Sequence, residues 1–176
     1  MPKLPDKGTA AIVWDPDGDN IVFKKAFEDI VFKDEEITSE VFEAQFGQTP
    51  VDEFTEGVKI NFEAVFTRED IEKLATFCVG ATVSGTTSKQ IEFSVPVGES
   101  KYQYAKQVII KPMVNQQPVS DESQWLYLYK CFPGRAFEIG FGTDQKKFSF
   151  NFKVFPDQDE ASPTYGKTHR FGTAAA

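Results

Sequence analysis

Residue types that carry enzyme chemistry are sparse in this chain. His169 is the only histidine, so a Ser-His-Asp or Cys-His arrangement would have to include it. It lies beside Arg170 in a polar C-terminal segment, where a mobile surface position is the favoured interpretation. We therefore expect the chain not to be an enzyme.

Three aspartates at alternate positions, Asp15, Asp17 and Asp19, have the spacing of the first ligands of an EF-hand calcium loop. Such a loop needs glycine at its sixth position and an acid at its twelfth, but this chain has Asn20 and Ala26 there. The segment therefore predicts a turn and not a calcium site. No other metal site and no cofactor is predicted.

An acidic cluster follows, and it could support acid–base chemistry or glycoside hydrolysis if its carboxylates met in a cleft. Its members are Glu28, Asp29, Asp34, Glu35 and Glu36. A solvated face is the favoured interpretation. The surrounding segment, residues 24–36, fits either a helical turn or a strand, and the sequence leaves both open.

Two aromatic ladders could stack sugars or bases. They consist of Tyr102 and Tyr104, and of Trp125, Tyr127 and Tyr129. No basic groove accompanies them in the sequence, so packing in the core or at an interface is favoured. Both cysteines, Cys78 and Cys131, are expected to be small buried hydrophobic residues rather than a disulfide or a metal pair.

Composition favours one β-rich domain without a membrane span. The 176 residues include 18 Phe, and aromatic residues favour strands. No apolar run approaches the roughly 20 residues that cross a bilayer, and no signal sequence is evident, so we expect folding in a cytoplasm. The net charge of −8 argues against binding DNA through its phosphates, and solubility alone is a sufficient reason for it.

The clearest elements lie between residues 37 and 80. Alternating apolar side chains predict strands over residues 37–46 and 58–66. A capping box at Thr67 and apolar residues at helical spacing predict an α-helix over about residues 68–79, which Gly80 ends. Between the two strands, a polar loop is predicted.

Further strands are predicted along the rest of the chain. They cover residues 10–14, 21–24, 90–95, 108–113, 125–130, 136–141 and 147–155. Pro112 should confine its strand to a sheet edge or end it. Residues 1–9 predict a flexible N-terminal arm, and residues 157–176 predict a tail that stays free unless a partner orders it.

These elements predict a mainly β fold. Eight to ten strands and one helix fit a sandwich or barrel of two packed antiparallel sheets, with the helix of residues 68–79 flanking them. No repeat or linker divides the chain, so residues 1–176 are expected to form a single domain.

Part of this order resembles the tail tube proteins, or major tail proteins, of tailed bacteriophages. The phrase Gly47-Gln-Thr-Pro-Val-Asp52 is followed by a polar loop, by a strand that begins Gly57-Val-Lys-Ile, and by a helix that begins Thr67-Arg-Glu-Asp. The run from Lys147 to Asp157, KFSFNFKVFPD, is similar to the last core strand of that family. The resemblance covers about residues 20–156.

This resemblance implies a structural protein of the virion that is assembled in the host cytoplasm. Six copies would form a ring, and stacked rings would form a hollow conduit through which genomic DNA passes from the capsid to the host cell without specific binding. The tape measure protein, the tail terminator and baseplate or tail-tip proteins would be further partners, and no membrane would be involved. An acidic lumen would repel the DNA and let it slide.

Two sets of residues are candidates for this assembly. Residues 47–57 would form an inter-subunit loop, with stacking contacts from Thr49, Pro50, Val51, Asp52 and Phe54. The polar faces of two strands would line the lumen, through Lys59, Asn61 and Glu63 and through Ser149, Asn151 and Lys153. Because both faces contain lysine, the sequence leaves open which of them supplies an acidic lining.

The alternative is a monomeric β-sandwich module of a virion that binds a carbohydrate or another ligand. Such a module would account for the aromatic ladders and for the shortage of catalytic residues. It would account neither for the capped helix after the strand nor for the resemblance.

Overall fold

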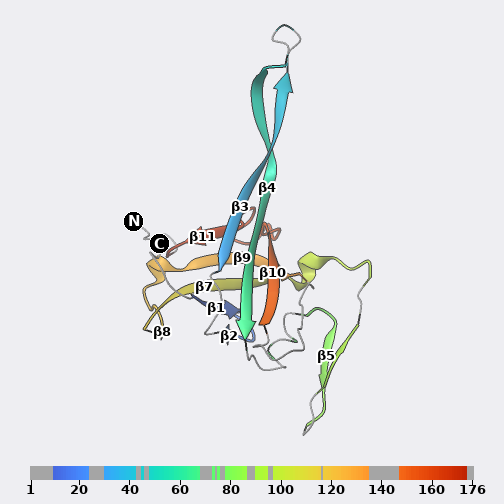
Figure 1. Cartoon of the computed structure of the whole chain (residues 1–176), viewed down its shortest axis with the longest axis vertical. Helices are drawn as coiled ribbons and strands as arrows, with labels where there is room; N and C mark the ends of the chain where they lie inside the picture. The colour runs from blue at the N-terminus through green and yellow to red at the C-terminus, as the bar shows by residue number, and fades with distance from the viewer. Residues whose placement is uncertain are drawn as a thin grey trace.

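The computed structural model has a β-rich body with one long arm and one short arm at opposite ends (Figure 1). It describes residues 10–23, 30–42, 45, 48–67, 73, 75, 78–86, 90–94, 97–115, 117–134 and 147–173. Strands dominate these residues and every strand pairing is antiparallel, which confirms the predicted mainly β class.

Nine of the strands form one large sheet. Seven of them lie side by side in the order β2-β1-β7-β9-β10-β4-β3, while β11 pairs with β9 and β8 pairs with β7. Their bounds are β1 (Ala10–Trp14), β2 (Ile21–Phe23), β3 (Val31–Phe42), β4 (Pro50–Thr67), β7 (Lys106–Val114), β8 (Gln117–Pro118), β9 (Leu126–Pro133), β10 (Lys147–Phe155) and β11 (His169–Phe171).

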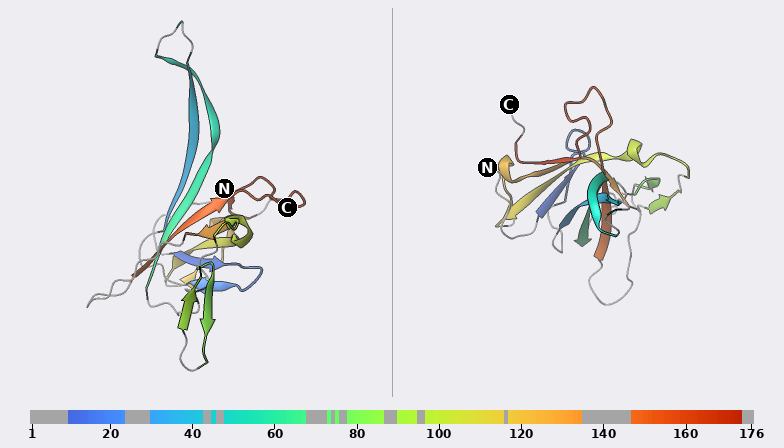
Figure 2. Two further views of the ribbon diagram at one scale, coloured as in Figure 1. Left: turned by 90° about the vertical axis from the view of Figure 1, so that its right-hand side faces the viewer. Right: turned by 90° about the horizontal axis from the view of Figure 1, so that it is seen from above.

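A smaller sheet forms the short arm of the molecule (Figures 1 and 2). It consists of β5 (Ala81–Ser84) and β6 (Gln90–Phe93). Two short 3-10 helices, η2 (Lys101–Tyr104) and η3 (Glu122–Gln124), follow it in the chain. The sequence predicted two packed sheets, and the structure has two sheets of very different size.

One face of the large sheet encloses the main core. The core side chains come from β1, β2, β4, β7, β9 and β10, together with Cys78. Trp14 on β1 lies 6.1 Å from Phe152 on β10, measured between ring centroids, although β7 and β9 separate these strands in the sheet. The sheet must therefore curl around the core to bring its two halves together.

The centre of this core is a pair of stacked rings. Phe62 and Phe152 are directly opposite residues on β4 and β10, and their centroids are 4.4 Å apart with an interplanar angle of 1°. Both side chains are essentially inaccessible to solvent. The period-2 prediction for β10 is confirmed here, because Phe152 and Val154 are buried whereas Lys153 between them is exposed.

The prediction for Pro112 was wrong. β7 lies inside the sheet between β1 and β9, and it continues through Pro112 to Val114. The reason is that β9 begins at Leu126, opposite Ile110, so Pro112 lies beyond the end of that ladder. Its missing N–H therefore interrupts no bond to β9, and its carbonyl accepts from the backbone N–H of Val119 at 2.8 Å.

The predicted helix and N-terminal arm fall largely outside the described residues. Of residues 68–77, the structure describes Lys73 and Ala75, and both have helical backbone. The turn that follows contains Gly80 with a φ of 77°, a conformation that suits glycine where a helix ends. Residues 1–9 lie wholly outside the described part of the chain.

The prediction of a free C-terminal tail was also wrong. Residues 157–173 fold back onto the body, and β11 pairs with β9. Hydrogen bonds hold the segment together and to the body. The Asp157 carboxylate accepts from the Thr164 hydroxyl at 2.6 Å within the segment, and from the hydroxyl of Tyr102 on η2 at 3.3 Å. The Thr164 hydroxyl, followed by that of Ser162, lowers the pKa of Asp157 to about 2.

Candidate assembly surface

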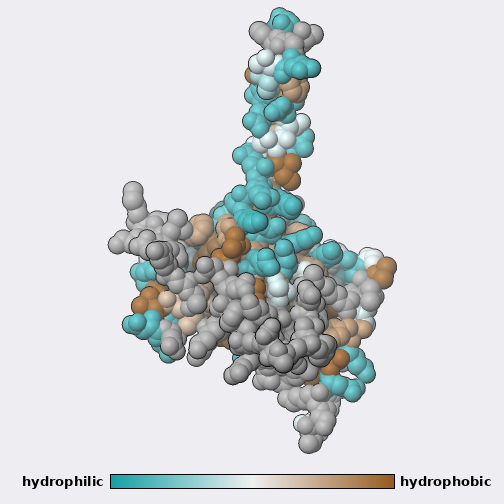
Figure 3. All heavy atoms as spheres, in the orientation of Figure 1, coloured by the Kyte–Doolittle hydropathy of each residue, from teal (hydrophilic) through white to brown (hydrophobic). Residues whose placement is uncertain are grey.

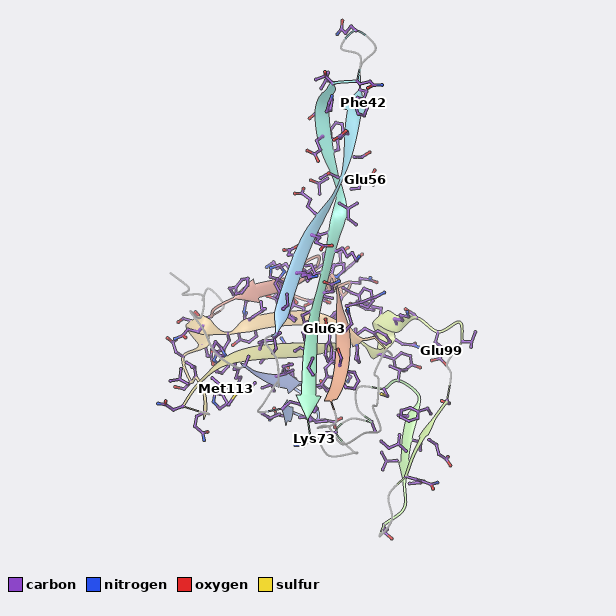
Figure 4. The ribbon with its side chains drawn as sticks, viewed as in Figure 1. Phe42, Glu56, Glu63, Lys73, Glu99 and Met113 are labelled. Carbon is purple, nitrogen blue, oxygen red and sulfur yellow. The ribbon has the colours of Figure 1, made fainter. Side chains whose placement is uncertain are left out.

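The long arm is the hairpin of β3 and β4, and it leaves the body at a sharply defined point. Along the core-facing side of β4, the exposed fraction is 1% at Phe62 and 3% at Ile60, but 53% at Val58. The body therefore ends between Ile60 and Val58. Figure 4 shows the same progression, with Glu63 on the body, Glu56 midway along the arm and Phe42 near its far end.

Beyond this point the two strands are paired only with each other in the described chain. The ladder runs from Glu36 opposite Val58 to Phe42 opposite Pro50. At about 3.3 Å per residue, this stretch extends roughly 20 Å from the body. The left view of Figure 2 shows the arm extending away from the body along this length.

The sequence analysis placed a loop at residues 47–57, but residues 50–57 belong to β4. Two register shifts in the ladder explain the error. Val51 and Glu56 each lack a partner on β3, so each adds one residue to β4 and breaks the period-2 pattern. Val51 and Phe54, the two apolar residues of this segment, are three positions apart in the sequence. This spacing does not have the period of two residues that indicates a strand.

One face of the free arm is apolar. Ile37, opposite Gly57, and Phe54, opposite Ser39, lie on this face, and the next pair along it is Val41 with Asp52. The exposed fractions of Ile37 and Phe54 are 46% and 59%. Figure 3 shows brown hydrophobic residues along the otherwise teal arm. We call Ile37, Val41 and Phe54 the apolar face of the arm.

The opposite face carries three glutamates, with the exposed side chains of Val58 and Phe42 at its two ends. Glu40 lies directly opposite Glu53, and Glu36, four residues before Glu40, shares their face and accepts a hydrogen bond from the Thr55 hydroxyl. All three glutamates are exposed. We call Glu36, Glu40 and Glu53 the acidic face of the arm, and it continues the core-facing side of the sheet.

The predicted stacking residues all lie on or beside this arm. Thr49 directly precedes β4, while Pro50, Val51, Asp52 and Phe54 belong to it, and all five are exposed. The structure thus groups them at the outer half of the hairpin, although on a strand and not in a loop. Sequence reasoning missed Ile37 and Val41, which the ladder brings onto the same face as Phe54.

The two sets of predicted lumen residues share one face of the sheet. Asn151 is directly opposite Glu63 and Lys153 is opposite Asn61, while the Ser149 hydroxyl donates to Glu63 at 2.6 Å. This face lies opposite the core. It adds Lys33 and Glu35 from β3, which are the partners of Asn61 and Lys59. Lysines and acids are therefore mixed across it, and neither strand supplies a purely acidic surface.

The aromatic ladder of β9 is closed to ligands. Tyr127 and Tyr129 are buried. The Lys111 ammonium lies 3.6 Å from the ring centroid of Trp125, and the Arg170 guanidinium lies 4.0 Å from that of Tyr127. Burial lowers the pKa of Lys111, which is consistent with the position of its ammonium directly over the indole ring of Trp125. The ladder packs within the protein, as the sequence analysis favoured.

His169 is not on a mobile tail as predicted. It lies on β11, and its ring packs against Phe32 and Phe171 with centroid distances of 5.2 and 5.9 Å. Its Nε2 atom is 3.8 Å from an oxygen of Asp34, near the base of the arm. Cys78 and Cys131 are both buried, as predicted.

The comparisons with known proteins add no family. No family model matches the chain, and no curated protein matches its sequence. Within the described residues, no three His, Cys, Asp or Glu side chains are grouped so that they could hold a metal ion. A search of the same residues finds no helix with the length and hydrophobicity that crossing a membrane requires.

Proposed function

We propose that this protein is a self-assembling structural subunit of a bacteriophage tail tube. The observation that carries the proposal is the β3–β4 arm, which extends roughly 20 Å from the body and exposes Ile37 and Phe54. A two-stranded ribbon gains little stability alone in water. An arm of this length with a solvated apolar face is the kind of element that a neighbouring subunit covers.

The sheet edges support the same proposal. β3 is the last strand of the large sheet along its main path, and it is 12 residues long. A long open edge promotes pairing with another chain, and a closed ring of subunits removes such edges. Six copies joined in a ring, with rings stacked through the arms, would use both the edge and the apolar face.

The conduit function concerns a different surface from the arm. The shared polar face of β4 and β10 is our candidate lumen wall, with Lys59, Asn61, Glu63, Ser149, Asn151 and Lys153. Its mixed charge would neither attract nor strongly repel duplex DNA. Passage of genomic DNA, location in the virion, and contacts with tape measure, terminator and baseplate or tail-tip proteins belong to the proposal through the resemblance alone. The flanking helix at residues 68–79 belongs to it through the capping box and the apolar spacing.

The alternative is a monomeric module that binds a carbohydrate or another ligand, and the β9 ladder does not support it. The aromatic side chains of this ladder are buried or covered by Lys111 and Arg170. We therefore prefer the assembling subunit.

The experiment that tests the proposal removes the arm and keeps the body. Residues 38–56 are replaced by Asn-Gly, which forms a two-residue hairpin turn between the paired residues Ile37 and Gly57. Because the core begins at Ile60, we expect this variant to fold with a cooperative thermal transition. Sedimentation velocity should show large assemblies for the intact protein and monomers or single rings for the variant.

A folded armless variant that forms the same large assemblies as the intact protein would refute the role of the arm. An intact protein that remains monomeric at high concentration would refute self-assembly of the free subunit. Replacing exposed Val97 and Val114 by serine provides a control that removes surface apolar groups elsewhere.

A further inference from the structure

The charge of this protein is concentrated on one segment. Between Val31 and Glu63 the sequence has nine acidic and two basic side chains, a net charge of −7, against −8 for the whole chain. The rest of the chain is therefore close to neutral, with 17 basic and 18 acidic residues. A charge kept only for solubility needs no such concentration on one element.

The acidic face of the arm has an unfavourable arrangement in the isolated subunit. Glu40 and Glu53 are directly opposite each other, and like charges at such positions destabilise a strand pair. Glu36 adds a third carboxylate on the same face. A cationic surface brought against this face would relieve the repulsion.

The body carries a group of lysines at one end of its mixed polar face. Lys130 and Lys153 lie on neighbouring strands, where they are opposite Phe155 and Phe132, and the pairing places all four on the face away from the core. The Lys101 ammonium lies 5.7 Å from the Phe132 ring centroid, which adds a third lysine to the group. We call Lys101, Lys130 and Lys153 the lysine patch. If a neighbour covers this patch, Lys153 faces that neighbour, and the lumen wall consists of the other candidate residues.

The acidic face cannot reach the lysine patch of its own chain. Glu36 and Glu40 are four and eight residues after Phe32 on β3, so all three side chains lie on the same side of the strand. Phe32 packs against the core, and the two glutamates are therefore on the core side of the sheet. The lysine patch lies on the other side of the same sheet. Any contact between them must therefore join two copies.

We propose that the acidic face of the arm of one copy docks on the lysine patch of the next copy. This inference rests on the proposed assembly and specifies its partner surface. The two surfaces differ, so the contact is head-to-tail, and repetition generates an open stack instead of a closed pair. The charges would set orientation and register. The apolar face lies on the other side of the arm, so in this arrangement it remains available to a second neighbouring copy.

The test uses two charge-reversed variants that fail alone and assemble together. The first is Glu40→Lys with Glu53→Lys, which keeps one like-charge pair across the hairpin and so leaves its internal repulsion comparable. The second is Lys101→Glu with Lys153→Glu, both at exposed positions. In a mixture, the reversed arm of the first variant can dock on the reversed patch of the second. The unchanged arm of the second variant can dock on the unchanged patch of the first.

We expect each variant alone to need at least about a tenfold higher concentration to assemble than the intact protein, from the loss of two charge contacts. The equimolar mixture should assemble at close to the concentration that the intact protein needs. The control is Asp17→Lys with Asp19→Lys, in the exposed turn between β1 and β2. It changes the net charge by the same amount as the arm variant and should assemble normally. Thermal melts establish that every variant is folded.

If the intact protein forms stacks but the two variants assemble normally, or their mixture fails to recover, the docking inference is wrong and the proposed function stands. If the control is impaired as much as the arm variant, net charge and not docking governs assembly, which also overturns the inference. If the intact protein forms no stacks, both proposals fail.

Discussion

Removing the two most exposed side chains of the apolar face should weaken assembly and leave the fold intact. The perturbation is Ile37→Ser with Phe54→Ser, at positions whose exposed fractions are 46% and 59% in the isolated subunit. Because the body does not cover these side chains, their loss should change the free energy of unfolding by no more than about 0.5 kcal/mol.

The expected effect on assembly follows from the area that a neighbour would cover. Full burial of an Ile or Phe side chain contributes about 1.5 to 3 kcal/mol, and about half of each of these side chains remains to be buried. The two together should contribute about 1.5 to 3 kcal/mol per contact. This corresponds to an increase of about 10- to 150-fold in the concentration at which assembly begins.

Light scattering across a dilution series measures this concentration, and circular dichroism melts measure stability. Val97→Ser with Val114→Ser is the matched control, because these valines are at least as exposed but lie outside the arm. Equal assembly of the arm variant and the intact protein would show that the apolar face is simply solvated, and the reasoning from exposure to contact would be refuted.

Three other predictions concern the body. Phe152→Ala removes one member of the ring stack with Phe62 from a fully buried site, and chemical denaturation should show a loss of about 3 to 5 kcal/mol in stability. The pKa of Asp157, lowered from 3.8 to about 2, means that this carboxylate stabilises the fold above about pH 4 and that its contribution is lost as the pH falls towards 2. Asp157→Asn should therefore lower the melting temperature at pH 7, and its difference from the intact protein should shrink between pH 4 and 2; a constant difference would contradict the assignment. Burial raises the pKa of the Cys131 thiol, so this cysteine should react with a maleimide only after denaturation, as peptide mapping of labelled protein would show.

The sequence predicted well the elements whose residues alternate without interruption. β10 and the body half of β4 have regular period-2 patterns, and the structure pairs Phe62 with Phe152 and Ile60 with Val154 across them. Period 2 alone decides which face such residues occupy, so core and polar faces could be predicted without knowing the neighbouring strand. What could not be predicted was that the two polar faces lie on adjacent strands of one surface.

The outer arm was missed because its strand is irregular. The extra residues Val51 and Glu56 break the alternation, and Pro50 at the start of β4 suggests a loop. The register with β3 decides that Ile37 and Phe54 share a face, and register over a distance of 17 residues is not visible in local patterns.

The C-terminal segment was missed for a different reason. Its residues are polar, and polarity usually indicates solvation. Here the Thr164 hydroxyl donates a hydrogen bond to the Asp157 carboxylate. The hydroxyl of Tyr102, more than 50 residues earlier in the chain, donates to the same carboxylate. A segment that is held by hydrogen bonds to distant partners leaves no periodic apolar signal.

Electron microscopy of the purified intact protein, concentrated at neutral pH and low salt, tests whether the subunits assemble into a tube. We expect hollow tubes of stacked rings with six-fold symmetry in end views, with the arm of each subunit lying against the next ring. Uniform single particles of about 20 kDa at every concentration, confirmed as monomers by light scattering, would contradict it.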